Sequence, residues 1–212
     1  MGSDRFRRIT VIVLDSVGIG GAPDADRYGD AGADTVGHIA GSVGLDLPHL
    51  GRLGLSRLVS LGPTAVEGAY GRMSERSAGK DTMTGHFEIA GLILEDPYPT
   101  YPEGFPPEVI DASSDSIGRT VLGNRAASGT AILDEHGPEH QEGGGPILYT
   151  SADSVFQLAA HVDVVPLEEL YRWCEVAREI LRTPHTVARV IARPFCGRPG
   201  AYERTKDRRD YA

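Results

Sequence analysis

Residues 9–14 read Ile9-Thr10-Val11-Ile12-Val13-Leu14, a nearly continuous run of β-branched and apolar side chains. Such a run is typical of a strand that is covered on both faces, as in a parallel sheet. The run ends on Asp15, and the segment that follows contains too many glycines to form a helix. We expect that segment to form a loop over the carboxyl end of the strand, where open α/β sheets bind their ligands. The sequence therefore predicts an α/β fold.

The composition excludes several classes of function. Lys and Arg number 21 against 30 Asp and Glu, a net charge of −9, whose sign disfavours a nonspecific nucleic-acid partner. No apolar run approaches the roughly 18 residues that cross a bilayer, and the polar N-terminus lacks a signal segment, so we expect no membrane partner and a cytoplasmic location. Two cysteines, Cys174 and Cys196, are too few for a disulfide framework and are expected to be reduced thiols.

Caps and apolar spacing predict the other elements of secondary structure. We expect helices over residues 35–40, from residue 48, over residues 82–91, from residue 107, after residue 153 and over residues 167–182, and strands over residues 70–73, 147–150 and 187–192. The Gly- and Glu-rich stretch 135–145 has no periodicity and is expected to be a mobile loop. His136, His140 and His161 lack a convincing metal-ligand spacing and are expected to be structural or surface residues.

Five prolines between residues 95 and 107 favour an extended crossover over another βα unit. We therefore place a domain boundary after residue 97. The first domain, residues 1–97, carries the predicted α/β elements. The second domain, residues 98–212, has the mixed pattern of an α+β unit.

Two residues of the first domain are candidates for phosphate chemistry. Asp15 ends a predicted buried strand, a position from which a carboxylate can hold a divalent cation, although it could also satisfy nearby backbone N–H groups in a turn. Thr82 lies in the first turn of a predicted helix, where exposed N–H groups and the helix dipole stabilise a phosphate. With a cation beside it the Thr82 hydroxyl could act as a nucleophile; otherwise it merely caps the helix.

The second domain offers polar groups for a phosphorylated polyol. Arg189 and Arg193 lie four residues apart on a predicted strand and so point to the same face. Guanidinium groups bind phosphate bidentately, and a carboxylate such as Asp153 accepts hydrogen bonds from sugar hydroxyls. The alternative is a solvated salt-bridge face without a ligand.

Taken together, these stretches resemble the bacterial phosphopentomutases of the alkaline phosphatase superfamily. The resemblance runs from about residue 6 to the last residue. Its motifs are Val13-Leu14-Asp15-Ser16-Val17-Gly18-Ile19-Gly20, Gly79-Lys80-Asp81-Thr82-Met83-Thr84-Gly85-His86, residues 149–154, and Arg189-Val190-Ile191-Ala192-Arg193-Pro194-Phe195. The block from Lys80 to His86 is specific to the family within its superfamily.

The resemblance implies the first part of an alkaline-phosphatase-like α/β core with an inserted α+β cap domain. It also implies interconversion of (deoxy)ribose 1-phosphate and (deoxy)ribose 5-phosphate through a phosphothreonine enzyme and a sugar bisphosphate, with two Mn²⁺ ions. Thr82 matches the phosphorylated threonine and a metal-binding position, and Asp15 matches a metal ligand. Lys80, Asp81 and His86 would support the phosphate, and the sugar phosphate would contact cap positions that match Ser151, Asp153, Arg189, Ile191 and Arg204.

The chain departs from the family pattern at its end. In the family the second half of the core follows the cap and carries most of the Asp and His metal ligands, whereas here the sequence stops at Ala212. We therefore expect an incomplete chain that is not a competent mutase by itself. Two alternatives are a related metal-dependent mutase or phosphatase, such as a phosphoglycerate mutase, and a noncatalytic fragment that binds sugar phosphate.

Overall fold

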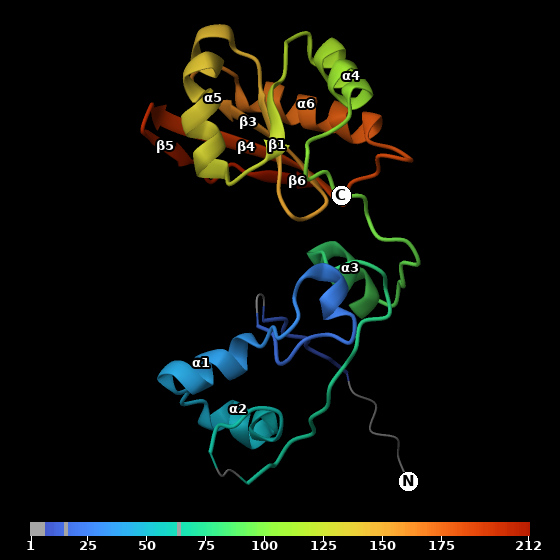
Figure 1. Cartoon of the computed structure of the whole chain (residues 1–212). Helices are drawn as coiled ribbons and strands as arrows, with labels where there is room; N and C mark the ends of the chain where they lie inside the picture. Colours follow the sequence, from blue (N-terminus) through green and yellow to red (C-terminus); the bar gives the residue numbers. More distant parts are fainter. Residues whose placement is uncertain (1–6, 15–16, 63–64) are drawn as a thin grey trace. The chain divides into compact units, whose positions relative to one another are not determined.

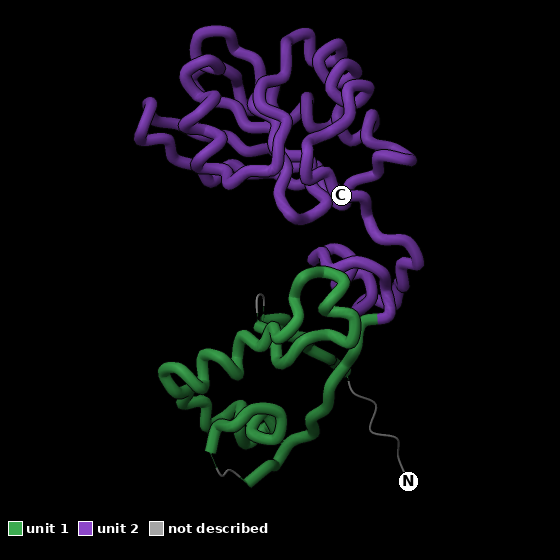
Figure 2. The backbone as a smooth tube through the Cα atoms, viewed as in Figure 1, with its two compact units in different colours: residues 1–75 green, residues 76–212 purple. Residues whose placement is uncertain are grey.

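The computed structural model describes residues 7–14, 17–62 and 65–212. The chain divides into two compact units, Met1–Glu75 and Arg76–Ala212 (Figure 2). Together they form a mixed α/β structure whose sheet lies in the second unit. The division falls earlier than the domain boundary expected after residue 97, and that boundary stays a prediction.

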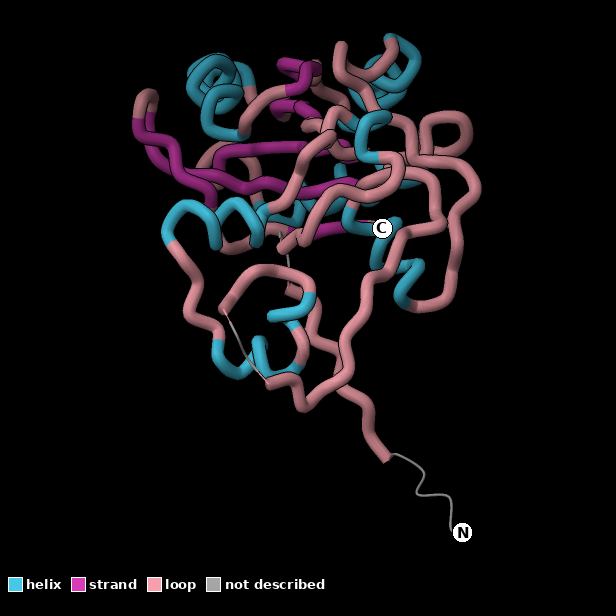
Figure 3. The backbone as a smooth tube through the Cα atoms, turned by 60° about the horizontal axis from the view of Figure 1, so that its bottom comes forward, coloured by secondary structure: helices cyan, strands magenta, loops and turns pink. Residues whose placement is uncertain are grey.

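The described part of the first unit contains helices and loops but no strand (Figure 3). Its elements are η1 (Ala25–Tyr28), α1 (Thr35–Val43), α2 (Pro48–Leu53) and η2 (Leu55–Arg57). Asp34 caps α1 by accepting a hydrogen bond from the Gly37 N–H at 3.0 Å, and Pro48 opens α2, as expected. The strands predicted over residues 9–14 and 70–73 are wrong. A strand needs a hydrogen-bonding neighbour, and neither segment has one among the described residues.

The second unit is built on a six-stranded mixed sheet (Figure 1). Its strands are β1 (Leu122–Ala126), β2 (Ile147–Thr150), β3 (Val155–His161), β4 (Arg189–Arg198), β5 (Ala201–Arg204) and β6 (Arg209–Tyr211). The order is β1-β2-β3-β4-β5, with β6 also paired to β4. The β1–β2 and β3–β4 pairs are parallel and the others antiparallel. The predicted strand over residues 147–150 is confirmed, and that over 187–192 overlaps β4.

Helices cover both faces of this sheet. The core on one face joins α4 (Pro107–Ile117) and α6 (Leu167–Ile180) to β2, β3 and β4. On the opposite face, α5 (Gly129–Gly143) packs Ile132 and Leu133 against Tyr149 and Phe195. The predicted helices at residues 107 and 167–182 are confirmed, because a Pro at the first position and an apolar stripe at helical spacing are local signals. Among the described residues no helix is both long and apolar enough to cross a membrane.

Two expectations for this unit are wrong. The segment after Asp153 forms the buried strand β3 instead of a short helix. The stretch 135–145, expected to be a mobile loop, belongs largely to α5 despite Pro138. Packing explains the second case, because a Cβ on Gly137 would lie 2.4 Å from the Tyr202 ring. That glycine lets the helix approach β5 closely, which sequence propensity alone does not indicate.

Candidate functional site

A pocket of about 210 Å³ opens on the face of the sheet that α5 shares. All five residues predicted to bind the sugar phosphate line it: Ser151, Asp153, Arg189, Ile191 and Arg204. They come from the β2–β3 connection, from β4 and from β5. The fold therefore gathers side chains that are as much as 53 positions apart in the sequence, from 151 to 204.

The strand register explains this gathering. Arg189 and Ile191 alternate with buried apolar residues along β4, so both face the pocket. Arg189 pairs with Val155, the first residue of β3, which places it beside the connection that carries Ser151 and Asp153. The pocket thus combines cationic, carboxylate and hydroxyl groups on a rigid sheet edge.

Asp210 anchors the arginines on one side of the pocket. Its carboxylate lies 3.2 Å from Nη1 of Arg189 and accepts two hydrogen bonds of 2.6 Å from Arg208. Burial opposes ionisation of Asp210, but these guanidinium groups outweigh it and hold its pKa below the usual value. Nε of Arg189 is buried and has no hydrogen-bond partner among the described residues. A buried donor without a partner is costly unless a ligand or water satisfies it.

Sequence reasoning missed three groups around this pocket: Asp210, Gln157 and Tyr149. Gln157 had a signal, since it is the one polar residue in the apolar run 155–160, and its amide oxygen accepts a 3.0 Å hydrogen bond from Nε of Arg193. Tyr149 and Asp210 gave no local signal. Their roles follow from the sheet register.

Thr82 is the first residue of α3 (Thr82–Ile89) and is exposed. The carboxylate of Asp81 caps this helix by accepting hydrogen bonds from the N–H groups of Met83 and Thr84, both at 3.0 Å, and from the Thr84 hydroxyl at 2.6 Å. Thr84 is fully buried, so the Asp81 contact serves structure. Thr82 itself is the exposed first residue of the helix, and its expected role as the phosphate acceptor stays a prediction.

The other predicted residues near Thr82 have different surroundings. His86 is exposed, and its Nδ1 lies 2.8 Å from the Thr82 carbonyl oxygen one turn earlier, within the same helix. Lys80 is exposed in the loop before the helix. Neither these residues nor Thr82 line the pocket described above. Asp15 lies outside the described residues, so its predicted role as a metal ligand stays a prediction.

The described ranges contain no group of three or more His, Cys, Asp or Glu side chains that could hold a metal ion. An Asp and a Thr fall short of the ligands that a pair of divalent cations needs.

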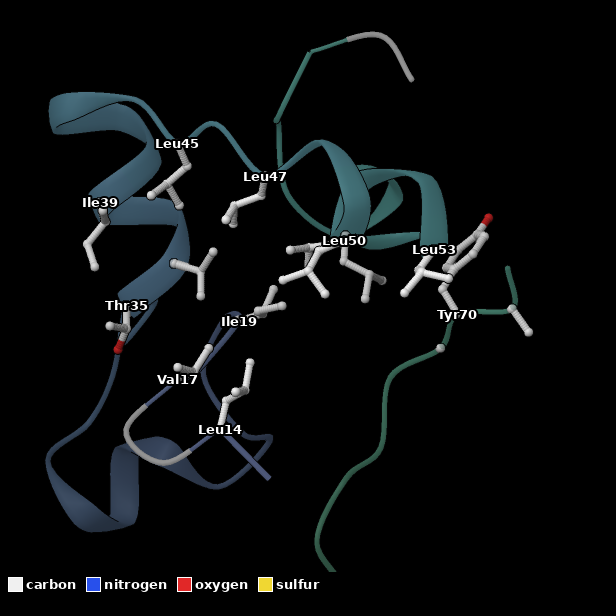
Figure 4. A pocket seen from close by; sticks show the side chains of 15 residues that line it. Leu14, Val17, Ile19, Thr35, Ile39, Leu45, Leu47, Leu50, Leu53 and Tyr70 are labelled. Carbon is white, nitrogen blue, oxygen red and sulfur yellow. The ribbon is translucent and has the colours of Figure 1, made fainter. Parts of the chain in front are cut away.

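A larger pocket, of about 610 Å³, lies in the first unit. Figure 4 shows Leu14, Val17 and Ile19 converging on it with apolar side chains of α1 and α2, such as Ile39 and Leu50. No charged side chain lines it, so it does not suit a phosphate. Many large apolar residues of this unit are exposed, including Ile9 at 82% and Ile12 at 78%.

Comparison with known proteins identifies the relatives of this chain. A phosphopentomutase of Caldanaerobacter subterraneus subsp. tengcongensis is 58% identical over 98% of the chain, and one of Carboxydothermus hydrogenoformans is 55% identical over the same share. The chain is a homologue of the phosphopentomutases. It spans about half the length of these phosphopentomutases, 54% and 55% respectively.

A third phosphopentomutase, from Clostridium acetobutylicum, is 54% identical over 97% of the chain, which again spans 54% of the relative. No family model matches the chain. The resemblance to phosphopentomutases noted in the sequence is confirmed by these relatives, which are isomerases of the phosphotransferase type by name and chemistry.

Proposed function

We propose that this chain is one part of a phosphopentomutase, carrying the phosphoryl-accepting threonine and the sugar-phosphate pocket. The observation that supports this most strongly is the convergence of Ser151, Asp153, Arg189, Ile191 and Arg204 on one pocket. Arginines, a carboxylate and a hydroxyl together suit a ligand that bears both a phosphate and sugar hydroxyls.

In the proposed reaction, the bond between the Thr82 oxygen and phosphorus breaks as the phosphoryl group passes to a hydroxyl oxygen of a pentose monophosphate. The proton of that hydroxyl passes to the Thr82 oxygen, so that a free Thr82 hydroxyl and a sugar bisphosphate form. Transfer of the other phosphoryl group back to Thr82 breaks its bond to the sugar oxygen, which takes up the proton that the Thr82 hydroxyl gives up. The cycle consumes no oxidant, reductant or water.

The protein's own groups contribute positioning. The positive end of the α3 dipole would stabilise a phosphate on Thr82, while the Met83 and Thr84 N–H groups stay bound to Asp81, and the pocket residues would hold the sugar. Mn²⁺ is the ion that the resemblance implies; Asp15 and Thr82 would hold it together with further ligands outside this sequence, and it would neutralise phosphoryl oxygens. The exposed apolar residues of the first unit, together with the doubled length of the relatives, support a second half of the core that covers them.

A chimeric chain tests this proposal. Residues 1–212 are joined to the part of the Caldanaerobacter phosphopentomutase that lies beyond the matched region, and isomerisation of ribose 5-phosphate is followed with added Mn²⁺. We expect activity from the chimera, its loss on Thr82→Ala, and its retention on Thr84→Ser, which keeps the hydroxyl bound to Asp81. Full activity of the Thr82→Ala chimera would remove Thr82 from the mechanism.

The chain alone is expected to bind pentose phosphate without turning it over. This second candidate function is favoured because the pocket is fully formed by residues 127–204, whereas the described residues hold no metal-binding group. A panel of pentose phosphates and phosphoglycerates distinguishes it from a phosphoglycerate mutase, since a phosphoglycerate lacks the ring hydroxyls that Ser151 and Asp153 would contact.

A further inference from the structure

Three arginines line the pocket, Arg189, Arg193 and Arg204, and they differ in their partners. A fourth, Arg208, binds Asp210 beside the pocket. Arg189 and Arg208 share the carboxylate of Asp210. Arg193 and Arg204 form no ion pair with any carboxylate in the described part of the chain. In a protein with a net charge of −9, two neighbouring guanidinium groups without a counter-ion are unexpected.

The sheet holds these two arginines close together. Arg204 on β5 pairs with Phe195 on β4, and Arg193 lies two residues before Phe195, so the two arginines are diagonal neighbours on one face. Diagonal neighbours in antiparallel strands are about 7–8 Å apart at their Cα atoms. Burial lowers the pKa of Arg193; the charges of Arg208 and Arg204 act in the same direction, and that of Asp210 opposes them. An anion bound between Arg193 and Arg204 would add to the partial neutralisation by Asp210.

Gln157 fixes the side chain of Arg193. Its side chain is buried with only 4% of the residue exposed, and its amide oxygen accepts the hydrogen bond from Nε of Arg193. The two Nη groups of Arg193 have no protein hydrogen-bond partner in the described ranges. Because one donor is held by a rigid strand, the remaining donors are oriented in advance for a ligand.

Gly129 makes room for the side chain of Arg204. It is the first residue of α5, and a Cβ built on it would lie only 1.6 Å from Nη2 of Arg204. The guanidinium of Arg204 therefore rests against the N-terminal end of α5. A cation at that end opposes the helix dipole, whereas an anion shared by the arginine and the helix N–H groups relieves the conflict.

Arg189 provides an independent sign of a ligand. It lines the same pocket, and its Nε is buried without a hydrogen-bond partner among the described residues. A buried donor is costly unless a ligand or water satisfies it. An oxygen of a ligand in this pocket would supply the acceptor.

We propose that Gln157 and Gly129 are positioning residues that hold Arg193 and Arg204 as a clamp for a single phosphate group. The clamp lies at the Arg193 end of the pocket, and Ser151 and Asp153 lie at the Arg189 end. The Cα atoms of Arg189 and Arg193 are about 13 Å apart along β4. The pocket accordingly selects a ligand with a phosphate at one end and hydroxyls at the other. That selectivity rests on the proposed function, whereas the clamp itself requires only an anion.

Binding to the 212-residue chain tests the clamp, with inorganic phosphate and ribose 5-phosphate titrated separately at low ionic strength. Gly129→Ala displaces Arg204 without changing charge, and Gln157→Leu releases Arg193. Each substitution is expected to lower the affinity for both ligands about tenfold, which corresponds to the loss of one charge-assisted contact. Gly143→Ala in the same helix is the control, since a Cβ there meets nothing within 4 Å, and it should bind as the wild type does.

The Gln157→Glu variant tests whether Gln157 positions Arg193 for a ligand or only stabilises the fold. It keeps Arg193 in place but supplies a carboxylate partner, so phosphate affinity should fall while the melting temperature holds. Wild-type binding of ribose 5-phosphate that survives both Gly129→Ala and Gln157→Leu would overturn the clamp and leave the proposed function standing. Binding of phosphate but not of ribose 5-phosphate would support the clamp and contradict the proposed function, and binding of neither by the wild type would contradict both.

Discussion

The backbone N–H of His161 donates a hydrogen bond to Nε2 of His140 across 2.8 Å. The other ring nitrogen of His140, Nδ1, lies 2.6 Å from the carbonyl oxygen of Gly145. A ring that donates from Nδ1 and accepts at Nε2 is the neutral form. The contact joins the end of α5 to β3, and it makes this packing sensitive to protonation.

We predict that the second unit loses stability as the pH falls below about 6.5. Burial, the largest cause, lowers the pKa of His140 in the folded chain, so below the unfolded value of 6.5 the unfolded state binds more protons. The free energy of unfolding should then fall by up to about 1.4 kcal/mol per pH unit from this residue.

Trp173 is the only tryptophan and is buried in the second unit, so its fluorescence follows the unfolding of that unit. Urea denaturation between pH 7.5 and 5.5 should show the fall in the free energy of unfolding. The His140→Gln variant should show a weaker dependence of this free energy on pH. His86→Gln, at an exposed histidine, is the control. An equal pH dependence in the His140→Gln and wild-type chains would contradict the assignment.

Asn124 should be difficult to replace. Its φ is +71°, and its side chain both accepts from the Phe105 N–H at 2.7 Å and donates to the Phe105 carbonyl at 2.9 Å. Asn124→Gly keeps the backbone conformation and loses the two hydrogen bonds, at about 1–3 kcal/mol. Asn124→Ala adds the left-handed strain, about 1 kcal/mol more. We expect the denaturant midpoint to fall from the wild type to Asn124→Gly and further to Asn124→Ala. An Asn124→Ala variant as stable as Asn124→Gly would contradict the strain at this position.

Asp81 should control the start of α3. Asp81→Ala removes the acceptor of the Met83 and Thr84 N–H groups and is expected to cost about 1 kcal/mol of local stability. Hydrogen exchange at those two amides should accelerate, while Asp81→Asn retains most of the protection. Asp96→Ala, at an exposed carboxylate beyond the helix, is the control. Unchanged exchange in Asp81→Ala would show that packing of Thr84 alone holds the helix start.

Much of the local structure could be predicted from the sequence. Caps such as Asp34 and Asp81 and the apolar stripe of α6 act within a few residues, so their signals are legible along the chain. The strand prediction for residues 9–14 was wrong because strand formation depends on a neighbouring strand that is distant in the sequence. Similarly, α5 forms through the close approach of Gly137 to β5, which no local pattern indicates.

The candidate site divides in the same way. Ser151, Asp153 and Arg189 could be selected by resemblance, and the sheet then brings them together. Gly129 gave no signal and Gln157 only that of a polar residue in an apolar run, because their importance lies in contacts with arginines 75 and 36 positions away, from 129 to 204 and from 157 to 193. Such contacts exist only in the folded chain.

Backbone amide shifts of the 212-residue chain during a ribose 5-phosphate titration test most directly whether this pocket binds a pentose phosphate. We expect saturable shifts centred on Ser151, Asp153 and Ile191 that disappear in Arg189→Ala, a variant whose Trp173 fluorescence should still report a folded second unit. Saturable shifts confined to residues outside this pocket, or no shifts at all, would contradict it.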